Sequence, residues 1–177
     1  MRSLIPGNIW RKFCSNMFHI VLVEPEIPPN TGNIIRLCVN AGARLSLIEP
    51  LGFDLQHKSI SRSAMDYYTC LQQRAQIEVH PDFQALLDKY RPVRLFAATT
   101  KAQQLYTEVH YQPDDFLIFG PESRGLNQSL LNLLPDNNKI RIPMCSAGRS
   151  INLANAVAII TYEAWRQQQF SPVIRPV

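Results

Sequence analysis

The segment 139–168, KIRIPMCSAGRSINLANAVAIITYEAWRQQ, constrains the fold more than any other part of this chain. Its pattern predicts a short strand over 139–142, a loop of small and polar residues, and a long helix capped by Ser150. Apolar residues cover most of the helix and leave only a narrow polar stripe, which contains Asn152, Asn155 and Tyr162. A helix of this kind is expected to be buried on most of its sides, so other elements must pack around it.

Short apolar runs alternate with helical segments along the rest of the chain. Strands are predicted at 18–23, 44–48, 77–79, 93–99 and 115–119, and helices at 32–41, 54–62, 81–90 and 126–133. This rhythm predicts an α/β fold with a mainly parallel sheet flanked by helices. Ligands bind such sheets beyond the carboxyl ends of the strands, which here lie near 24–25, 98–100, 120–122 and 143–144.

Length and composition fit one globular domain. The chain has 177 residues, of which 46% are hydrophobic and 18% are charged. We expect the folded domain to span 17–170, between an N-terminal extension of residues 1–16 and a tail of residues 171–177. The longest uninterrupted apolar run covers only 156–160, far short of the ~20 residues of a membrane-spanning helix, so no membrane association is expected.

Residues 1–16 are basic and contain no acidic residue. They lack the apolar core of a secretory signal, because Pro6 and Gly7 interrupt the stretch. A mitochondrial presequence, a plain N-terminal extension and an upstream start that precedes the true Met17 all remain open. We favour the last two, and no function is built on this stretch.

The charge distribution and the cysteine spacing argue against a generally basic nucleic-acid-binding surface and against a metal site. The net charge is +4, but Arg2, Arg11 and Lys12 supply three of these charges, so any polyanion site in the domain must be local. The four cysteines show no C-x-x-C spacing and the four histidines are scattered, so no metal site is expected. Reduced thiols fit a cytoplasmic protein.

The common nucleotide-binding and hydrolase motifs are absent from the sequence. No G-x-G-x-x-G follows the first strand, and FGPESRGL has Leu126 where a phosphate-binding loop needs lysine. No G-x-S-x-G nucleophile elbow is present either. Three other segments stand out: PPNTGNIIRLCVNAGA, FGPESRGL and RIPMCSAGRSINLANA.

Together these three segments resemble the motifs of the SPOUT superfamily of S-adenosylmethionine-dependent RNA methyltransferases. EPEIPPNTGNIIRLC and NLANAVAIITYEAWRQ are most similar to its small, single-domain subgroup. The resemblance covers roughly 17–170. It implies an α/β-knot, in which the C-terminal segment forms a trefoil knot, and a homodimer whose protomers pair through helices. The apolar helix after 150 would then be buried against both its own sheet and the partner protomer.

The resemblance also implies site residues. S-adenosyl-L-methionine would lie among three loops, and the matching cofactor-binding positions are Ala98, Gly120, Ile142 and Ser150. Arg36 matches the catalytic arginine of the first motif. Because arginine is a poor base, we prefer a role in stabilising negative charge on the ribose oxygen over a role in removing its proton. The predicted substrate-binding residues are Asn30, Lys58, Arg62, Glu122, Arg124, Asn152 and Tyr162.

The implied function is 2′-O-methylation of the wobble nucleotide, C34 or U34, of tRNA. An anticodon stem-loop is a substrate small enough for a protein without an added RNA-binding domain, and its loop nucleotide exposes the 2′-hydroxyl. Two alternatives stay open: the same chemistry at another RNA site, and a non-catalytic RNA-binding knot protein.

Overall fold

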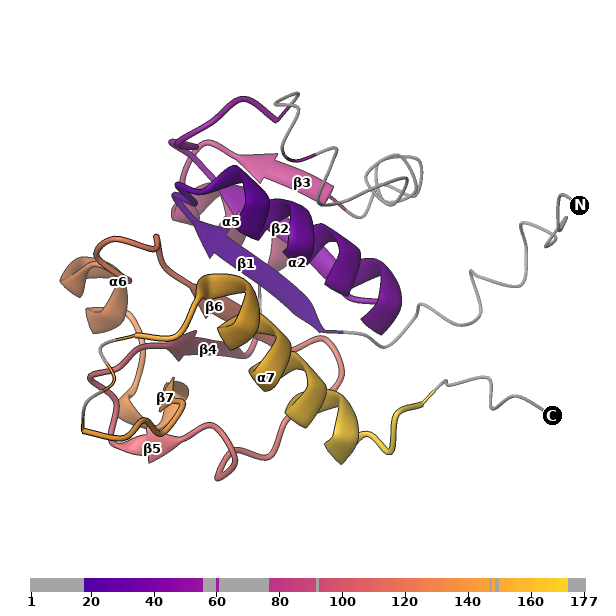
Figure 1. The fold of residues 1–177 in the computed structure, drawn as a ribbon, viewed down its shortest axis with the longest axis vertical. Helices are drawn as coiled ribbons and strands as arrows, with labels where there is room; N and C mark the ends of the chain where they lie inside the picture. The colour runs from indigo at the N-terminus through magenta and orange to yellow at the C-terminus, as the bar shows by residue number, and fades with distance from the viewer. Residues whose placement is uncertain are drawn as a thin grey trace, which may run out of the picture.

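The computed structural model describes residues 18–55, 60, 77–91, 93–146, 148 and 150–171. Within these ranges a seven-stranded sheet has the order β3-β2-β1-β6-β4-β7-β5, and every strand pairing in it is parallel. The strands are β1 (His19–Val23), β2 (Arg44–Ile48), β3 (Ile77–His80), β4 (Leu95–Ala98), β5 (Gln104–Leu105), β6 (Phe116–Phe119) and β7 (Lys139–Arg141). The predicted α/β fold with a parallel sheet is therefore confirmed (Figure 1).

Helices cover both faces of the sheet. Within the described ranges they include α2 (Pro28–Ala41), α5 (Phe83–Tyr90), α6 (Gln128–Asn132) and α7 (Leu153–Gln167), and a 3₁₀ turn covers Asp136–Asn138. Buried hydrophobic residues of α2 and α7, among them Ile34 and Val157, belong to one hydrophobic cluster. Those of α5 and α6 belong to a second cluster, which includes Leu86 and Leu130. The alternating side chains of the central strands divide between these two clusters, so each helix layer is fixed to its own face.

The predicted start of the first helix is wrong by four residues. The sequence predicted that Pro28 and Pro29 would delay the helix until residue 32, but α2 begins at Pro28 with Ile27 as its N-cap. Proline is tolerated in the first turn of a helix, because the N–H groups there have no intrahelical partner. Gly42 ends α2 in the left-handed conformation, as expected.

The cap of α7 also differs from the prediction. Asn152, not Ser150, is the N-cap residue, and its Oδ1 accepts hydrogen bonds from the backbone N–H groups of Ala154 (2.9 Å) and Asn155 (3.4 Å). Asparagine caps helices as well as serine does, so composition alone did not decide between two candidates so close in sequence. The helix therefore begins three residues after Ser150.

The sequence missed β5, and the position of β7 depends on this strand. Ala98 of β4 pairs with Ile140 on one side of β7, and Gln104 of β5 pairs with the same residue on the other side. Because only 99–103 join β4 to β5, β7 lies between two strands that are near neighbours in the sequence. β5 has two residues and no apolar alternation, so no sequence pattern marks it.

One face of α7 is less buried in the single chain than the sequence predicted. Five of its residues are buried: Leu153, Val157, Ile160, Thr161 and Ala164. Ala158, Ile159 and Trp165 are only partly buried, and 43% of Tyr162 is exposed. Within the described residues, no helix is both long enough and apolar enough to cross a membrane.

Candidate functional site

A cavity of about 510 Å³ opens at the carboxyl ends of β4, β6 and β7. Its walls come from the three loops that follow these strands, from the first turn of α2 and from the start of α7. This is the edge where the sequence predicted a ligand site. The apolar part of the wall includes Ile27, Phe119, Leu126, Ile140, Ile142, Met144 and Leu153. The volume and this mixture of apolar and polar walls are typical of a small-molecule site.

All four predicted cofactor-binding residues line this cavity: Ala98, Gly120, Ile142 and Ser150. Gly120 also has a steric reason to be glycine. A Cβ atom at this position would lie 2.3 Å from the backbone N of Leu126 and 2.4 Å from the carbonyl carbon of Gly125. Any side chain here would force the loop 120–126 away from the end of β6, so this loop can fold back only over glycine.

Three predicted substrate-binding residues form one hydrogen-bonded chain. Asn152 Nδ2 donates to Asn30 Oδ1 (2.9 Å), and Asn30 Nδ2 donates to Glu122 Oε1 (2.9 Å). The backbone N–H groups of Glu26 and Ile27 donate to the same carboxylate at 2.9 and 3.2 Å. The chain connects α2, the loop after β6 and the cap of α7, so these three side chains fix one another's orientation.

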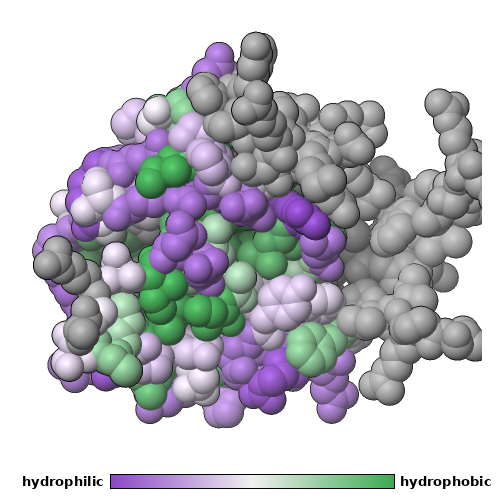
Figure 2. Space-filling view, viewed as in Figure 1, coloured by the Kyte–Doolittle hydropathy of each residue, from purple (hydrophilic) through white to green (hydrophobic). Residues whose placement is uncertain are grey.

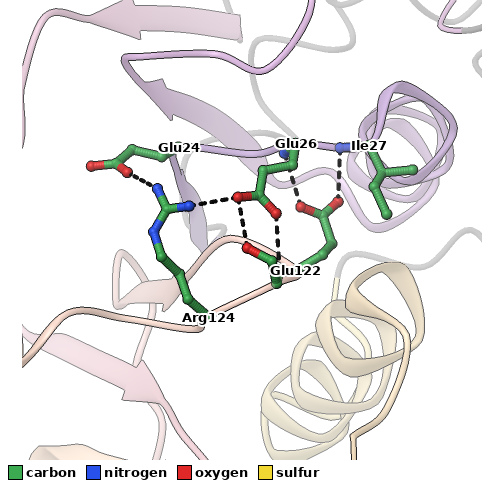
Figure 3. Close-up of polar contacts among 6 residues, drawn as sticks. Glu24, Glu26, Ile27, Glu122 and Arg124 are labelled. Carbon is green, nitrogen blue, oxygen red and sulfur yellow. Dashed lines mark hydrogen bonds and ion pairs between the residues drawn. The ribbon is translucent and has the colours of Figure 1, made fainter.

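Arg124 lies at the cavity between two carboxylates (Figure 3). Its guanidinium forms ion pairs with Glu24 and with Glu26, the latter at 2.6 Å. Glu26 also accepts hydrogen bonds from the N–H (3.0 Å) and the hydroxyl (2.8 Å) of Ser123. The hydrogen bond from the Ser123 side chain, with Arg124 beside it, holds the pKa of Glu26 below its usual value.

Two predicted residues do not reach the cavity, and two cannot be placed. Arg36 is exposed on α2 and Tyr162 is exposed on α7, where its ring contacts Trp165 at 5.5 Å between centroids. Neither is among the described residues that line the cavity. Lys58 and Arg62 lie outside the described residues, together with most of the predicted helix 54–62.

The sequence prediction missed three charged residues of this region. Glu24 and Glu26 hold Arg124, and Lys101 lines the cavity from the loop after β4. Glu24 and Lys101 each follow the end of a predicted strand, which was the available signal. No group of histidine, cysteine, aspartate and glutamate able to hold a metal ion occurs within the described part of the chain.

Comparison with known proteins gives consistent matches. The model of the SpoU rRNA Methylase family matches residues 17–162. A Yersinia pestis protein named tRNA (cytidine(34)-2′-O)-methyltransferase is 53% identical over 156 residues, covering 85% of this chain and 94% of that protein.

Two solved structures resemble the fold. One, described as giving structural insights into the 2-OH methylation of C/U34 on tRNA, has a TM-score of 0.80 and 38% identity, and covers 88% of this chain and 98% of that one. The other is the SpoU methyltransferase AviRb from Streptomyces viridochromogenes in complex with the cofactor AdoMet. It has a TM-score of 0.73 and 23% identity, and covers 88% of this chain and 59% of that one.

Proposed function

The chain belongs to the SpoU rRNA methylase family, and from that premise we propose that it methylates the ribose 2′-oxygen of the wobble nucleotide, C34 or U34, of tRNA. The observation that carries this proposal is the cavity in which all three marked sequence segments meet. The relative of Yersinia pestis bears this activity in its name and is matched over nearly its whole length. A cytoplasmic location, which was expected from the sequence, would suit a protein that acts on tRNA.

The cavity fits S-adenosyl-L-methionine as the cofactor. Its apolar wall, with Ile142 and Met144, would cover the adenine ring, and the glycine at position 120 lets the loop 120–126 fold back to form one wall of the cavity. The cofactor supplies an electrophilic methyl group. The hydrogen bonds that join Asn30 to Glu122 and to Asn152 would keep three walls of the cavity in fixed positions around the bound cofactor.

Arg36 would stabilise the negative charge that develops on the ribose 2′-oxygen as the hydroxyl loses its proton. Arginine is in general a poor base and a good hydrogen-bond donor, which favours this role over that of a base. However, Arg36 lies six residues beyond Asn30, which is about 9 Å along the axis of α2, and it does not line the cavity of its own chain. A second protomer would bring an Arg36 to that cavity.

A homodimer accounts for the surface that carries α2 and α7. Hydrophobic residues gather in the middle of this face and hydrophilic ones surround them (Figure 2). Ile27 is 45% exposed and Tyr162 is 43% exposed, and several apolar residues of α7 are only partly buried. A symmetric dimer through this face would bury these residues and bring the two sites close to the interface.

We also propose that the C-terminal part of the chain forms the trefoil knot of this family. The supporting observation is the position of β7 between β4 and β5, which only the loop 99–103 connects. A chain segment that enters the sheet between two such close neighbours must pass across the loop joining them. This arrangement is rare, since a protein chain seldom passes through one of its own loops.

Nucleoside mass spectrometry tests the function directly. Purified tRNA from cells with and without the gene is digested, and the 2′-O-methylated pyrimidine at position 34 is quantified. We expect this nucleoside to disappear without the gene and to return when the purified protein and S-adenosyl-L-methionine are added to the tRNA. An unchanged wobble nucleotide, with loss of a methyl group elsewhere, would assign the protein to another RNA site.

A further inference from the structure

Three charged residues line the cavity within the described part of the chain: Lys101, Glu122 and Arg124. Two of them are already engaged with the protein. Glu122 accepts three hydrogen bonds, from Asn30 and from two backbone N–H groups, and Arg124 is held between Glu24 and Glu26. Both charges are therefore already compensated by partners within the protein, although the guanidinium of Arg124 has more N–H donors than these two contacts use.

Lys101 differs from these two residues. Its side chain is exposed and makes no hydrogen bond or ion pair with any described residue. Its backbone is nevertheless held in place: the N–H of Lys101 donates to Thr99 Oγ1 (3.3 Å), and the N–H of Ala102 donates to the carbonyl of Thr99 (3.3 Å). Thr99 is joined in turn to Ile140 of β7 by a hydrogen bond of 2.9 Å. The side chain of Lys101 is thus attached to a backbone turn that hydrogen bonds hold in place at the wall of the cavity.

The N-terminal end of α7 adds a second feature that favours an anion. Ile151, Asn152 and Leu153 line the same cavity, so the N-terminal end of α7 faces it. Asn152 Oδ1 already accepts from the N–H groups of Ala154 and Asn155, but the aligned backbone dipoles of a long helix still give this end a partial positive charge. An anionic group would therefore interact favourably both with Lys101 and with this end of α7.

We propose that Lys101 binds an oxyanion of a ligand in this cavity, and this rests on the function proposed above. Two ligands supply such a group: the carboxylate on the methionine part of the cofactor, and a phosphate of the RNA bound over it. Both accept charge-assisted hydrogen bonds from an ammonium group. Lys101 would thus favour ligands that carry an oxyanion, which the apolar wall alone would not distinguish from ligands that lack one.

Binding measurements on three variants test this and separate the two sources. Lys101→Ala removes the charge and Lys101→Arg keeps it. Lys89→Ala is the matched control, because Lys89 lies on α5, pairs with Glu78 at 2.8 Å and does not line the cavity. The ligands are S-adenosylhomocysteine, which carries the carboxylate, methylthioadenosine, which lacks it, and an RNA anticodon stem-loop.

If the carboxylate is the partner, Lys101→Ala weakens S-adenosylhomocysteine roughly tenfold or more in calorimetry and leaves methylthioadenosine unchanged. If a phosphate is the partner, the affinity for the stem-loop falls instead and its salt dependence loses about one ion. In both cases Lys101→Arg restores most of the binding. The proposal is overturned if Lys101→Ala binds all three ligands as Lys89→Ala does. A wild-type protein that binds neither S-adenosylhomocysteine nor the stem-loop would overturn the proposed function itself.

Discussion

At the scale of single residues, Arg36 is exposed on α2 and does not line the cavity. Its replacement should therefore change the rate of methyl transfer without changing the affinity for the cofactor. We expect Arg36→Ala to lower the rate of methyl transfer by roughly 10²–10³-fold, the usual cost of removing one group that stabilises an oxyanion. The affinity for S-adenosylhomocysteine should stay unchanged. Single-turnover assays and calorimetry measure the two quantities. Equal losses in rate and cofactor affinity would contradict the assigned role.

A second group of polar residues lies away from the cavity, beneath α5. His19 Nε2 and His80 Nε2 lie 2.8 and 3.2 Å from the hydroxyl of Ser46, and all three residues are buried. His80 Nε2 also lies 3.3 Å from Glu78, whose carboxylate accepts hydrogen bonds from Lys89 and Tyr90. Burial lowers the pKa of His19 to about 3 and also lowers the pKa of His80.

These two histidines predict a loss of stability in acid. In the folded protein both take up protons only below their ordinary pKa of 6.5, near which they take up protons in the unfolded chain. The unfolded state therefore binds more protons as the pH falls below 6.5. His19 costs about 1.4 kcal/mol of stability per pH unit between pH 6.5 and about 3, and His80 contributes in the same direction. Asp115 opposes this between pH 6 and 4, because burial raises its pKa to about 6.

His19→Phe isolates the larger contribution. The imidazole ring packs against Phe116 at 4.2 Å and Tyr90 at 5.0 Å between centroids, and its buried Nδ1 has no partner among the described residues. A phenyl ring retains this packing without a titrating group. Urea unfolding between pH 7 and 4 should therefore show a shallower loss of stability for the variant. The same slope in both proteins would show that His19 does not titrate on unfolding.

At the scale of elements, Asn152 connects the cap of α7 to the rest of the cavity. Its Oδ1 caps the helix, while its Nδ2 donates to Asn30. Asn152→Asp keeps the capping oxygen and places negative charge at a helix N-terminus, where it is tolerated, but it cannot donate to Asn30. Asn152→Ala loses both contacts.

The two substitutions should therefore differ. We expect Asn152→Ala to lose about 1 kcal/mol of stability, the typical value of an N-cap. Asn152→Asp should melt close to the wild type but bind S-adenosylhomocysteine several-fold more weakly, because the cavity walls are no longer held in register. Thermal melting and calorimetry provide the two readings. Wild-type affinity in Asn152→Asp would show that the hydrogen bond to Asn30 is not needed for the site.

At the scale of the whole molecule, a dimer in which Arg36 serves the partner's cavity makes a prediction that no single chain can meet. Arg36→Ala and Gly120→Val are each expected to be inactive, the second because its side chain clashes with the loop 120–126. Mixed after unfolding and refolding together, they should regain about a quarter of the wild-type activity, since half of the dimers then contain one complete site of two. Light scattering on each variant alone must first show a dimer.

If Arg36 instead acts in its own chain, the mixture stays inactive, because every site lacks either the arginine or the cavity. A monomer by light scattering would remove the dimer proposal altogether. In that case the partly buried apolar residues of α7 would need another cover.

The sequence by itself determined the parallel α/β architecture and the edge of the sheet at which the cavity opens. Apolar runs of strand length between helical segments predicted the parallel sheet, because both patterns follow from local geometry. The ends of the strands then located the cavity, and all four predicted cofactor positions line it. The match to the SpoU family agrees with the resemblance carried by the three motifs.

Only the tertiary structure determined which partners these residues have in hydrogen bonds, ion pairs and strand pairing. The segment 139–168 was predicted as a strand, a loop and a buried helix, but the short β5 that lies beside its strand has no sequence signal. Nothing local indicated that Glu24 and Glu26 would hold Arg124, or that Asn30 and Glu122 would lie within one hydrogen bond of each other. These partners are more than ninety residues apart in sequence, and only the packing of the sheet brings them together.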